Sequence, residues 1–295
     1  MTGSSDTARR DLLIGGLTPS RKMRVTDVGA NPLGDAPYKG LLTSGACEVF
    51  GFEPNLEAFE KLQAVKSDAE TYFPTAIGAP GERTLYLHPK SGFTSLFPLD
   101  SRALAFLGKG FWKNDRIQEI DVTTQNMDDI ADLPGIDLLK MDLQGGEFEV
   151  LQGGGAKLSK AVAIVTEVRF HRMYEGEAVF GDLDVALRAL GFKLHKLLFT
   201  KSIMLPHDEE KSVVRGRMTS QLLDGDAVYI RDADYSVDLN NDQRAYLAMA
   251  ADSVFQSFDL ALNCIGILAQ RGAVAPDLAA RYVAALPPRT LAENK

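Results

Sequence analysis

Two acidic side chains stand near the ends of the first two expected strands, where they could bind the polar groups of a ligand. Asp27 lies in the β-branched run Met23–Val28, and Glu53 ends the run Glu48–Glu53. Gly29 follows the first run and permits a sharp turn with close backbone approach. A strand, a glycine loop and a helix begin a βαβ unit, in which a ligand lies at the carboxyl ends of the strands. The sequence therefore predicts a ligand site beside Asp27, Gly29 and Glu53.

The loop excludes the common phosphate-binding patterns. A Walker loop needs Lys where this chain has Asp35, and a dinucleotide fingerprint needs Gly where it has Asn31. Asp27 and Asp35 would also repel a pyrophosphate. A carboxylate such as Glu53 can accept both hydroxyls of a ribose. We therefore expect a nucleoside with an amino-acid-like tail.

Three further side chains are candidate bases. Asp142 and Glu167 lie at the ends of the expected strands Ile136–Asp142 and Ala161–Val168, on the same rim, and His171 follows four residues after Glu167. Burial would raise a carboxyl pKa toward a useful value. Their separation in sequence does not favour a metal site, so none is predicted.

Simpler interpretations of these residues stay open. Asp27 could only tie down its loop, Glu53 could be an exposed acid at a strand end, and His171 could be a surface histidine. Asn55 could serve only as a helix N-cap, and the hydroxyls of Thr94 and Ser95 could serve only to hold a loop.

The elements that must position these residues indicate an α/β fold. Near-continuous apolar runs such as 162–165 are typical of strands covered on both faces, which implies a largely parallel sheet with helices above and below. The expected strands are Met23–Val28, Glu48–Glu53, Thr84–His88, Gln118–Val122, Ile136–Asp142, Ala161–Val168, Lys193–Phe199 and Ala227–Arg231. Expected helices between them are 38–44, 55–62 and one from Asp182 to Gly191.

The chain divides into three parts by composition. Residues 1–22 form a lead segment, 23–238 the α/β domain and 239–295 a helical extension. Helical spacing of apolar residues predicts one long helix from Asp242 to Gln270, capped by Gly272, and a short helix over 276–286. The extension could pack on its own domain or join two copies of the chain into a homo-oligomer.

Composition excludes several classes of protein. The 295 residues carry 40 acidic and 32 basic side chains, for a net charge of −8, so no broad nucleic-acid footprint is expected. No apolar run approaches a membrane span, and the N-terminal stretch does not read as a secretion signal. Cys47 and Cys264 lack the spacing of a zinc or redox site. We expect a cytoplasmic protein with reduced thiols.

Four segments together carry a family resemblance. They are DVGAN at 27–31, GFEPN at 51–55, IDLLKMDLQGGEFEVLQGG at 136–154 and AIVTEVRF at 163–170. With these motifs the chain resembles the FkbM-type methyltransferases over about residues 23–232. The family is a branch of the S-adenosylmethionine-dependent enzymes, with a seven-stranded, mostly parallel, Rossmann-like sheet. This chain departs from the family pattern where Pro32 and Leu33 precede Gly34, and where Gln144 replaces the usual Glu.

The resemblance implies a role for individual residues. Gly29, Ala30 and Asn31 would contact the methionine part of S-adenosylmethionine, with Asp27 near its amino group, and Glu53 would hold the ribose. The residues implied around the adenine are Pro54, Asn55, Thr75, Ala76 and Ile77. Asp142 and Gln144 would face the sulfonium and the substrate, which Thr94 and Ser95 would also touch.

These expectations combine into one reaction. We expect methyl transfer from S-adenosylmethionine to a hydroxyl of a small molecule, a sugar or a secondary metabolite, with Asp142, Glu167 or His171 as base. Two alternatives stay open. A nicotinamide-dependent dehydrogenase would also use Glu53 on a ribose but needs the missing middle glycine. A non-catalytic nucleoside-binding or assembly protein would use the sheet only as a scaffold.

Overall fold

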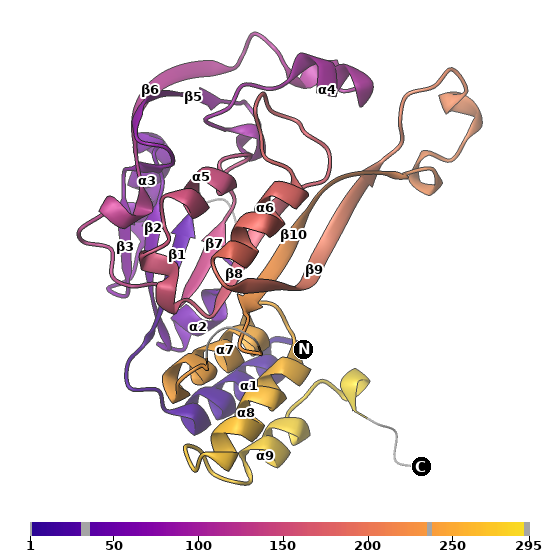
Figure 1. The fold of residues 1–295 in the computed structure, drawn as a ribbon. Coiled ribbons are helices and arrows are strands. Elements are labelled where there is room, and N and C mark those ends of the chain that lie inside the picture. The colour runs from indigo at the N-terminus through magenta and orange to yellow at the C-terminus, as the bar shows by residue number, and fades with distance from the viewer. Residues whose placement is uncertain (1, 31–35, 235–237, 292–295) are drawn as a thin grey trace.

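The computed structural model describes residues 2–30, 36–234 and 238–291. Figure 1 shows a twisted central sheet, a smaller sheet above it and a group of helices formed by the two ends of the chain. Asn31, Pro32, Leu33, Gly34 and Asp35, singled out above, lie outside the described residues.

The central sheet has seven strands in the order β3-β2-β1-β7-β8-β10-β9. In chain order they are β1 (Met23–Val28), β2 (Cys47–Phe52), β3 (Glu70–Phe73), β7 (Leu138–Met141), β8 (Ala163–Arg169), β9 (Phe192–Ile203) and β10 (Gln221–Arg231). Only β10 pairs in antiparallel fashion, with β8 and β9 on either side of it. The predicted Rossmann-like, mostly parallel sheet is confirmed.

Two of the expected strands belong to a second sheet instead. The second sheet has three strands, β4 (Ala76–Ile77), β5 (Gly81–Leu87) and β6 (Gln118–Gln125), in the order β4-β6-β5. β5 and β6 pair antiparallel over seven residue pairs, so the stretches expected at 84–88 and 118–122 do not join the central sheet. The short edge strand β3, which lacks a clear apolar pattern, completes the central sheet in their place.

Helices cover both faces of the central sheet. On one face the side chains of α5 (Glu147–Gln152) and α6 (Phe180–Ala189) pack against the apolar residues of the strands. On the other face lie α1 (Thr2–Leu17), α2 (Lys39–Thr43) and α7 (Asn241–Ser253). The remaining helices are α3 (Leu56–Val65), α4 (Ser101–Phe106), α8 (Phe258–Gln270) and α9 (Leu278–Ala284). Short 3-10 turns occur at 91–93, 110–112, 127–129, 157–160, 210–212, 215–217 and 288–290.

The two ends of the chain pack together. α1 lies against α7 and α9 beneath the sheet (Figure 1), and Leu13 and Leu17 of α1 are buried in the same core as the C-terminal helices. Arg9 of α1 donates to Asp252 of α7 at 2.7 Å, and the Tyr282 hydroxyl of α9 donates to the same carboxyl oxygen at 2.7 Å. Residues 2–17 therefore form a helix that the sequence patterns did not reveal.

The prediction of one long C-terminal helix is wrong. α7 ends at Ser253 and α8 begins at Phe258, because the chain turns at Gln256, whose φ is +49°. Phe255 at this turn is buried, and the Ser257 amide donates to the Ala251 carbonyl at 2.7 Å. Burial of Phe255 thus accompanies a break that no glycine or proline announces.

None of the described helices has the length and apolar character needed to cross a lipid bilayer. The expected association of two copies through the C-terminal helices stays a prediction.

Candidate active site

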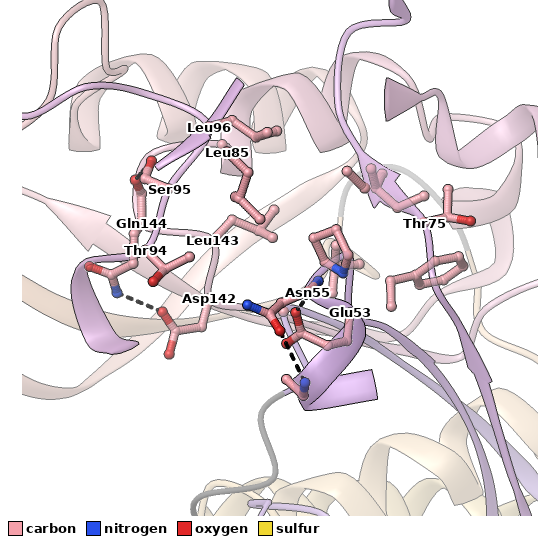
Figure 2. Close-up of a pocket in the computed structure, with 18 of the residues that line it drawn as sticks. Glu53, Asn55, Thr75, Leu85, Thr94, Ser95, Leu96, Asp142, Leu143 and Gln144 are labelled. Atoms are coloured by element: carbon pink, nitrogen blue, oxygen red, sulfur yellow. Dashed lines mark hydrogen bonds between the residues drawn. The ribbon is translucent and has the colours of Figure 1, made fainter. Parts of the chain in front are cut away.

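A cavity of about 270 Å³ opens at the carboxyl ends of β1, β2 and β7. In the sheet, β2 and β3 lie on one side of β1 and β7 lies on its other side. The strand order therefore reverses between β1 and β7, at the carboxyl ends where the cavity opens. Ligands of doubly wound sheets bind at such points. Figure 2 shows side chains from this edge and from the second sheet around the cavity.

Most of the residues predicted from the sequence meet here. Those that line the cavity are Gly29, Glu53, Pro54, Asn55, Thr75, Ala76, Ile77, Thr94, Ser95, Asp142 and Gln144. Four others, Asp27, Ala30, Glu167 and His171, are not among its lining residues. Asn31 lies outside the described residues.

Gly29 makes the turn out of β1 possible. Its φ is +85°, and a Cβ added there would lie 2.2 Å from the Asp142 carbonyl oxygen. The amides of Gly29 and Ala30 both donate to the Phe52 carbonyl, at 3.1 and 3.0 Å. These two N–H groups are therefore already used, and Gly29 can serve a ligand only by the close approach of its backbone.

Asp27 lies in β1, two residues before the cavity-lining Gly29, and is almost fully buried. Its carboxylate forms an ion pair with Lys140 of β7 at 2.9 Å and accepts from the Tyr38 hydroxyl at 2.6 Å. Lys140 Nζ also donates to the Gly29 carbonyl at 3.2 Å. Asp27 thus joins β1 to Lys140 of β7 and to Tyr38, and its role toward a ligand stays a prediction.

Glu53 follows the last residue of β2 and lines the cavity. One of its oxygens accepts from the Asn55 amide at 2.8 Å, while the Asn55 side chain caps α3 by accepting from the Ala58 amide at 3.1 Å. Burial raises the pKa of Glu53 to about 7, against the lowering effect of the Asn55 amide. A half-buried carboxylate with spare lone pairs is suited to the hydroxyls of a ligand.

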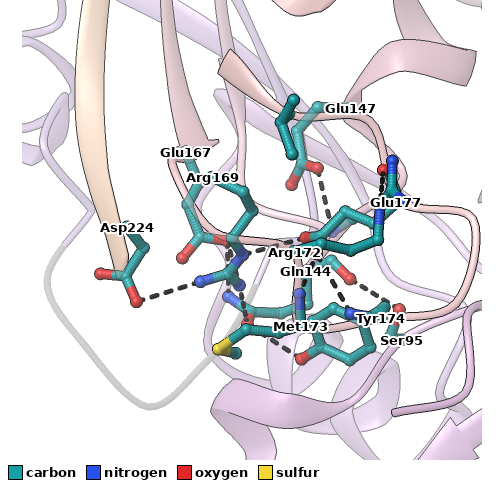
Figure 3. Close-up of polar contacts among 12 residues, drawn as sticks. Ser95, Gln144, Glu147, Glu167, Arg169, Arg172, Met173, Tyr174, Glu177 and Asp224 are labelled. Carbon is teal, nitrogen blue, oxygen red and sulfur yellow. Dashed lines mark hydrogen bonds and ion pairs between the residues drawn. The ribbon is translucent and has the colours of Figure 1, made fainter. Parts of the chain in front are cut away.

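Asp142, Gln144 and Glu167 form one hydrogen-bonded group at the cavity rim. The Gln144 carboxamide nitrogen donates to Asp142 at 2.8 Å and to Glu167 at 2.9 Å. Figure 3 shows the group continuing to Arg169, which donates to Glu167 at 2.8 Å. Burial raises the pKa of Glu167 well above its ordinary value, although the charge of Arg169 opposes the shift. Glu167 therefore reaches the cavity through Gln144.

His171 lies apart from this group. Its ring packs against Phe106 of α4, with 5.3 Å between the ring centroids, and burial lowers its pKa. The Ser95 hydroxyl donates to the Gln144 carbonyl at 2.7 Å, and Thr94 accepts from the His88 amide at 3.2 Å. Both hydroxyls at the cavity therefore also hold loops in place.

Sequence reasoning missed Lys140, Arg169 and Tyr174. Lys140 stands two positions before Asp142, and Arg169 two positions after Glu167, so each shares a sheet face with a residue that the sequence did single out. That spacing is the signal that could have found Lys140 and Arg169, whereas Tyr174 lies beyond β8 and has no such signal. Within the residues that the structure describes, no group of three or more His, Cys, Asp and Glu side chains is arranged to hold a metal ion.

Comparison with known proteins assigns the family. Residues 27–194, more than half of the chain, match the Methyltransferase FkbM domain. The chain belongs to the FkbM methyltransferase family. Members of this family depend on S-adenosylmethionine. The matched stretch includes the cavity residues from β1 to β7 as well as Glu167 and Arg169.

One curated relative is similar to about half of this chain. The 2-O-methyltransferase NoeI of Sinorhizobium fredii (strain NBRC 101917 / NGR234) is 29% identical over 167 residues. The match covers 52% of this chain and 66% of that protein, slightly less than two thirds of its length.

Solved structures give weaker similarities. Magnesium protoporphyrin IX methyltransferase from Synechocystis PCC 6803, with bound SAM, shares 13% identity over 77% of this chain and 78% of that chain, with a TM-score of 0.36. An S-adenosylmethionine-dependent methyltransferase from Mesorhizobium loti shares 11% identity over 78% and 99% of the two chains, with a TM-score of 0.35. At these scores the similarities support no conclusion about this chain.

The cavity suits the cofactor of the FkbM family. Its volume is near the lower end for small-molecule sites, and it combines the Glu53 carboxylate with apolar walls from Phe52, Ile77 and Leu85. A Cβ at position 29 would fill the space beside the Asp142 carbonyl, so the glycine keeps that approach open. The carboxyl groups of Glu53 and Asp142 in the lining match a nucleoside with a cationic tail better than a diphosphate.

Proposed function

We propose that the protein transfers a methyl group from S-adenosylmethionine to a hydroxyl of a sugar or secondary metabolite. Family membership supports the cofactor, and the name of the relative NoeI, a 2-O-methyltransferase, supports oxygen as the acceptor atom. The observation that carries the proposal is the pair of carboxyl groups, Asp142 and Glu167, that both accept from Gln144 at the rim of the cavity.

The cavity residues divide the work of binding the cofactor. Glu53 would accept hydrogen bonds from the ribose hydroxyls, because its carboxylate lines the cavity at the end of β2. The backbone at Gly29 would approach the methionine part. The adenine would lie among Pro54, Asn55, Thr75, Ala76 and Ile77, which line the same cavity.

Bound S-adenosylmethionine supplies an electrophilic methyl group on a positively charged sulfur. The chain must align an acceptor hydroxyl with that methyl and receive the hydroxyl proton. Glu167 is suited to receive it, since burial raises its pKa above that of an ordinary carboxyl group and Gln144 holds it at the rim of the cavity. Asp142 lines the cavity and is exposed, so it would orient the hydroxyl. We assign no proton transfer to His171, because its ring packs on Phe106 outside the cavity lining.

The test is transfer of label from methyl-labelled S-adenosylmethionine to a panel of neutral glycosides and phenolic metabolites. We expect label in an O-methyl product with the native chain and a loss of at least 100-fold in kcat with Glu167→Gln. The same loss should not occur with His171→Gln. Turnover by Glu167→Gln at the native rate would contradict the proposed base. Transfer of the label to an amine, and to none of the hydroxyl compounds, would contradict the proposed acceptor.

A further inference from the structure

Arg169 on β8 is almost fully buried and donates to four side chains (Figure 3). Its Nε lies 3.0 Å from Glu177 Oε1, and its Nη1 lies 3.1 Å from Asp224 Oδ2. Nη2 donates both to Gln144 Oε1 at 2.6 Å and to Glu167 Oε2 at 2.8 Å. Because a guanidinium has donors only, each of these four atoms must accept.

This requirement fixes the orientation of the Gln144 carboxamide. The oxygen and nitrogen of a carboxamide have nearly the same shape, so only their partners can tell them apart. Arg169 demands the oxygen, and the Tyr174 hydroxyl donates to the same oxygen at 3.2 Å. The nitrogen must then point the other way, where it donates to Asp142 Oδ1 and Glu167 Oε2.

One oxygen of each carboxyl group is held by this arrangement and the other is not. Glu167 Oε2 accepts from both Gln144 and Arg169, and Asp142 Oδ1 accepts from Gln144. Within the described part of the chain, no hydrogen bond reaches Glu167 Oε1 or Asp142 Oδ2. Each carboxyl group thus keeps one oxygen for another molecule.

We propose that Arg169 and Tyr174 are positioning residues for methyl transfer, which fix the Gln144 carboxamide so that it holds Asp142 and Glu167 in place. This inference rests on the proposed function. Arg169 and Tyr174 act through Gln144, and Arg169 also through its direct bond to Glu167. Glu177 holds both positioning residues, since it accepts from the Arg169 side chain and from the Met173 and Tyr174 amides, the last two at 2.7 and 3.1 Å.

The same contacts explain the glutamine at position 144. Both of its donor sites are used on carboxyl groups, at 2.8 and 2.9 Å. An ionised glutamate there would offer no donor and would place a third negative charge against Asp142 and Glu167. Gln144 therefore fits this pair of carboxyl groups better than the residue that the family pattern led us to expect.

The test measures the protonation of Glu167 directly in the whole protein. The carboxyl carbons of glutamate are labelled with ¹³C, the Glu167 signal is assigned with Glu167→Gln, and its NMR shift is followed against pH. Gln144→Asn shortens the side chain by one methylene but keeps a residue type that tolerates the φ of +57° found at this position. Tyr174→Phe removes one hydroxyl. Tyr282→Phe is the matched control, since it removes a buried hydroxyl bond to Asp252 in the terminal helices.

In Gln144→Asn we expect Glu167 to titrate at a pH higher by about one, because its carboxylate loses a donor. Tyr174→Phe should raise the midpoint by less, and Tyr282→Phe should leave it unchanged. Equal midpoints in the native chain, Gln144→Asn and Tyr174→Phe would overturn the positioning role.

This readout needs neither cofactor nor acceptor, so it separates the two proposals. A shifted midpoint without methyl transfer by the native chain would overturn the proposed function and leave the arrangement of the carboxyl groups standing. With a methylated acceptor in hand, Tyr174→Phe should lower kcat about tenfold and leave the KM for S-adenosylmethionine unchanged. A raised KM with native kcat would overturn the positioning role.

Discussion

Lys140 and Asp27, on neighbouring strands, form an ion pair of 2.9 Å, and Asp27 stands two residues before Gly29. Their register in the parallel pair of β1 and β7 sets them side by side, and Lys140 also donates to the Gly29 carbonyl. The side chain of Asp27 is 4% exposed and that of Lys140 is 17% exposed. The pair therefore stabilises the sheet and, through Lys140, also holds the backbone of Gly29 at the cofactor cavity.

Lys140→Met should lower the free energy of unfolding by about 3 kcal/mol, since it leaves the buried Asp27 carboxylate without its cation. Urea denaturation measures the loss. Lys61→Met is the control, because its partner Glu57 is 79% exposed on α3, and it should change stability by no more than about 0.5 kcal/mol. Equal effects of the two substitutions would show that the Asp27 pair contributes no more than a surface pair.

Gly29→Ala should be more destabilising than Gly45→Ala. Both glycines have positive φ, +85° and +71°, so both substitutions strain the backbone by about 1–2 kcal/mol. Only at Gly29 would the new Cβ meet another atom, the Asp142 carbonyl oxygen at 2.2 Å, whereas Gly45 has nothing within 4 Å. Thermal unfolding of the two variants measures the difference. A smaller loss at Gly29 than at Gly45 would contradict the close approach of the two loops.

The parts of the fold that could be predicted from the sequence are those set by interactions between residues close together in the chain. The β-branched run of β1 and the N-cap at Asn55 are local patterns, and both were predicted correctly. The turn at Gln256 is not local, because burial of Phe255 in the tertiary core accompanies it. Local propensity gave no signal there.

The same distinction between local patterns and tertiary contacts applies to the candidate active site. Glu53 could be expected at the cavity because it stands at the end of a strand that the sequence predicts. The role of Arg169 could not, because its partners Glu177 and Asp224 come from a loop after β8 and from β10, and only the folded chain brings them together. Pairing of Lys140 with Asp27 likewise needed the strand order.

Cofactor binding should weaken as the pH falls below about 7. The pKa of Glu53 is raised to about 7, and its ionised form is the one that accepts hydroxyl hydrogen bonds. Binding would therefore lower the pKa of Glu53, so affinity should be constant above about pH 7 and fall by up to tenfold per pH unit below it. Titrations with S-adenosylhomocysteine at pH values from about 5.5 to about 8.5, on both sides of this pKa, measure the dependence. Glu53→Gln should remove it, and an identical dependence in that variant would assign it to another group.

Arg9→Met should loosen the N-terminal helix. Arg9 pairs with Asp252 at 2.7 Å, and both side chains are nearly inaccessible to solvent, so the substitution leaves a buried carboxylate and should cost about 3 kcal/mol. Hydrogen exchange should show lost protection over α1 and α9. Arg188→Met removes a pair in which the arginine is 58% exposed, and it should leave this protection unchanged. Retained protection of α1 in Arg9→Met would mean that apolar packing alone holds the helix.

The most direct test of the account is calorimetric titration of the native chain, Glu53→Ala and Glu57→Ala with S-adenosylhomocysteine and, in parallel, NAD. Glu53 and Glu57 both line the cavity, but the Glu57 side chain is largely exposed. We expect S-adenosylhomocysteine to bind the native chain and Glu57→Ala alike, to bind Glu53→Ala more weakly by about 1–3 kcal/mol, and NAD to show no binding. Unchanged affinity in Glu53→Ala, or tighter binding of NAD than of S-adenosylhomocysteine, would contradict the account.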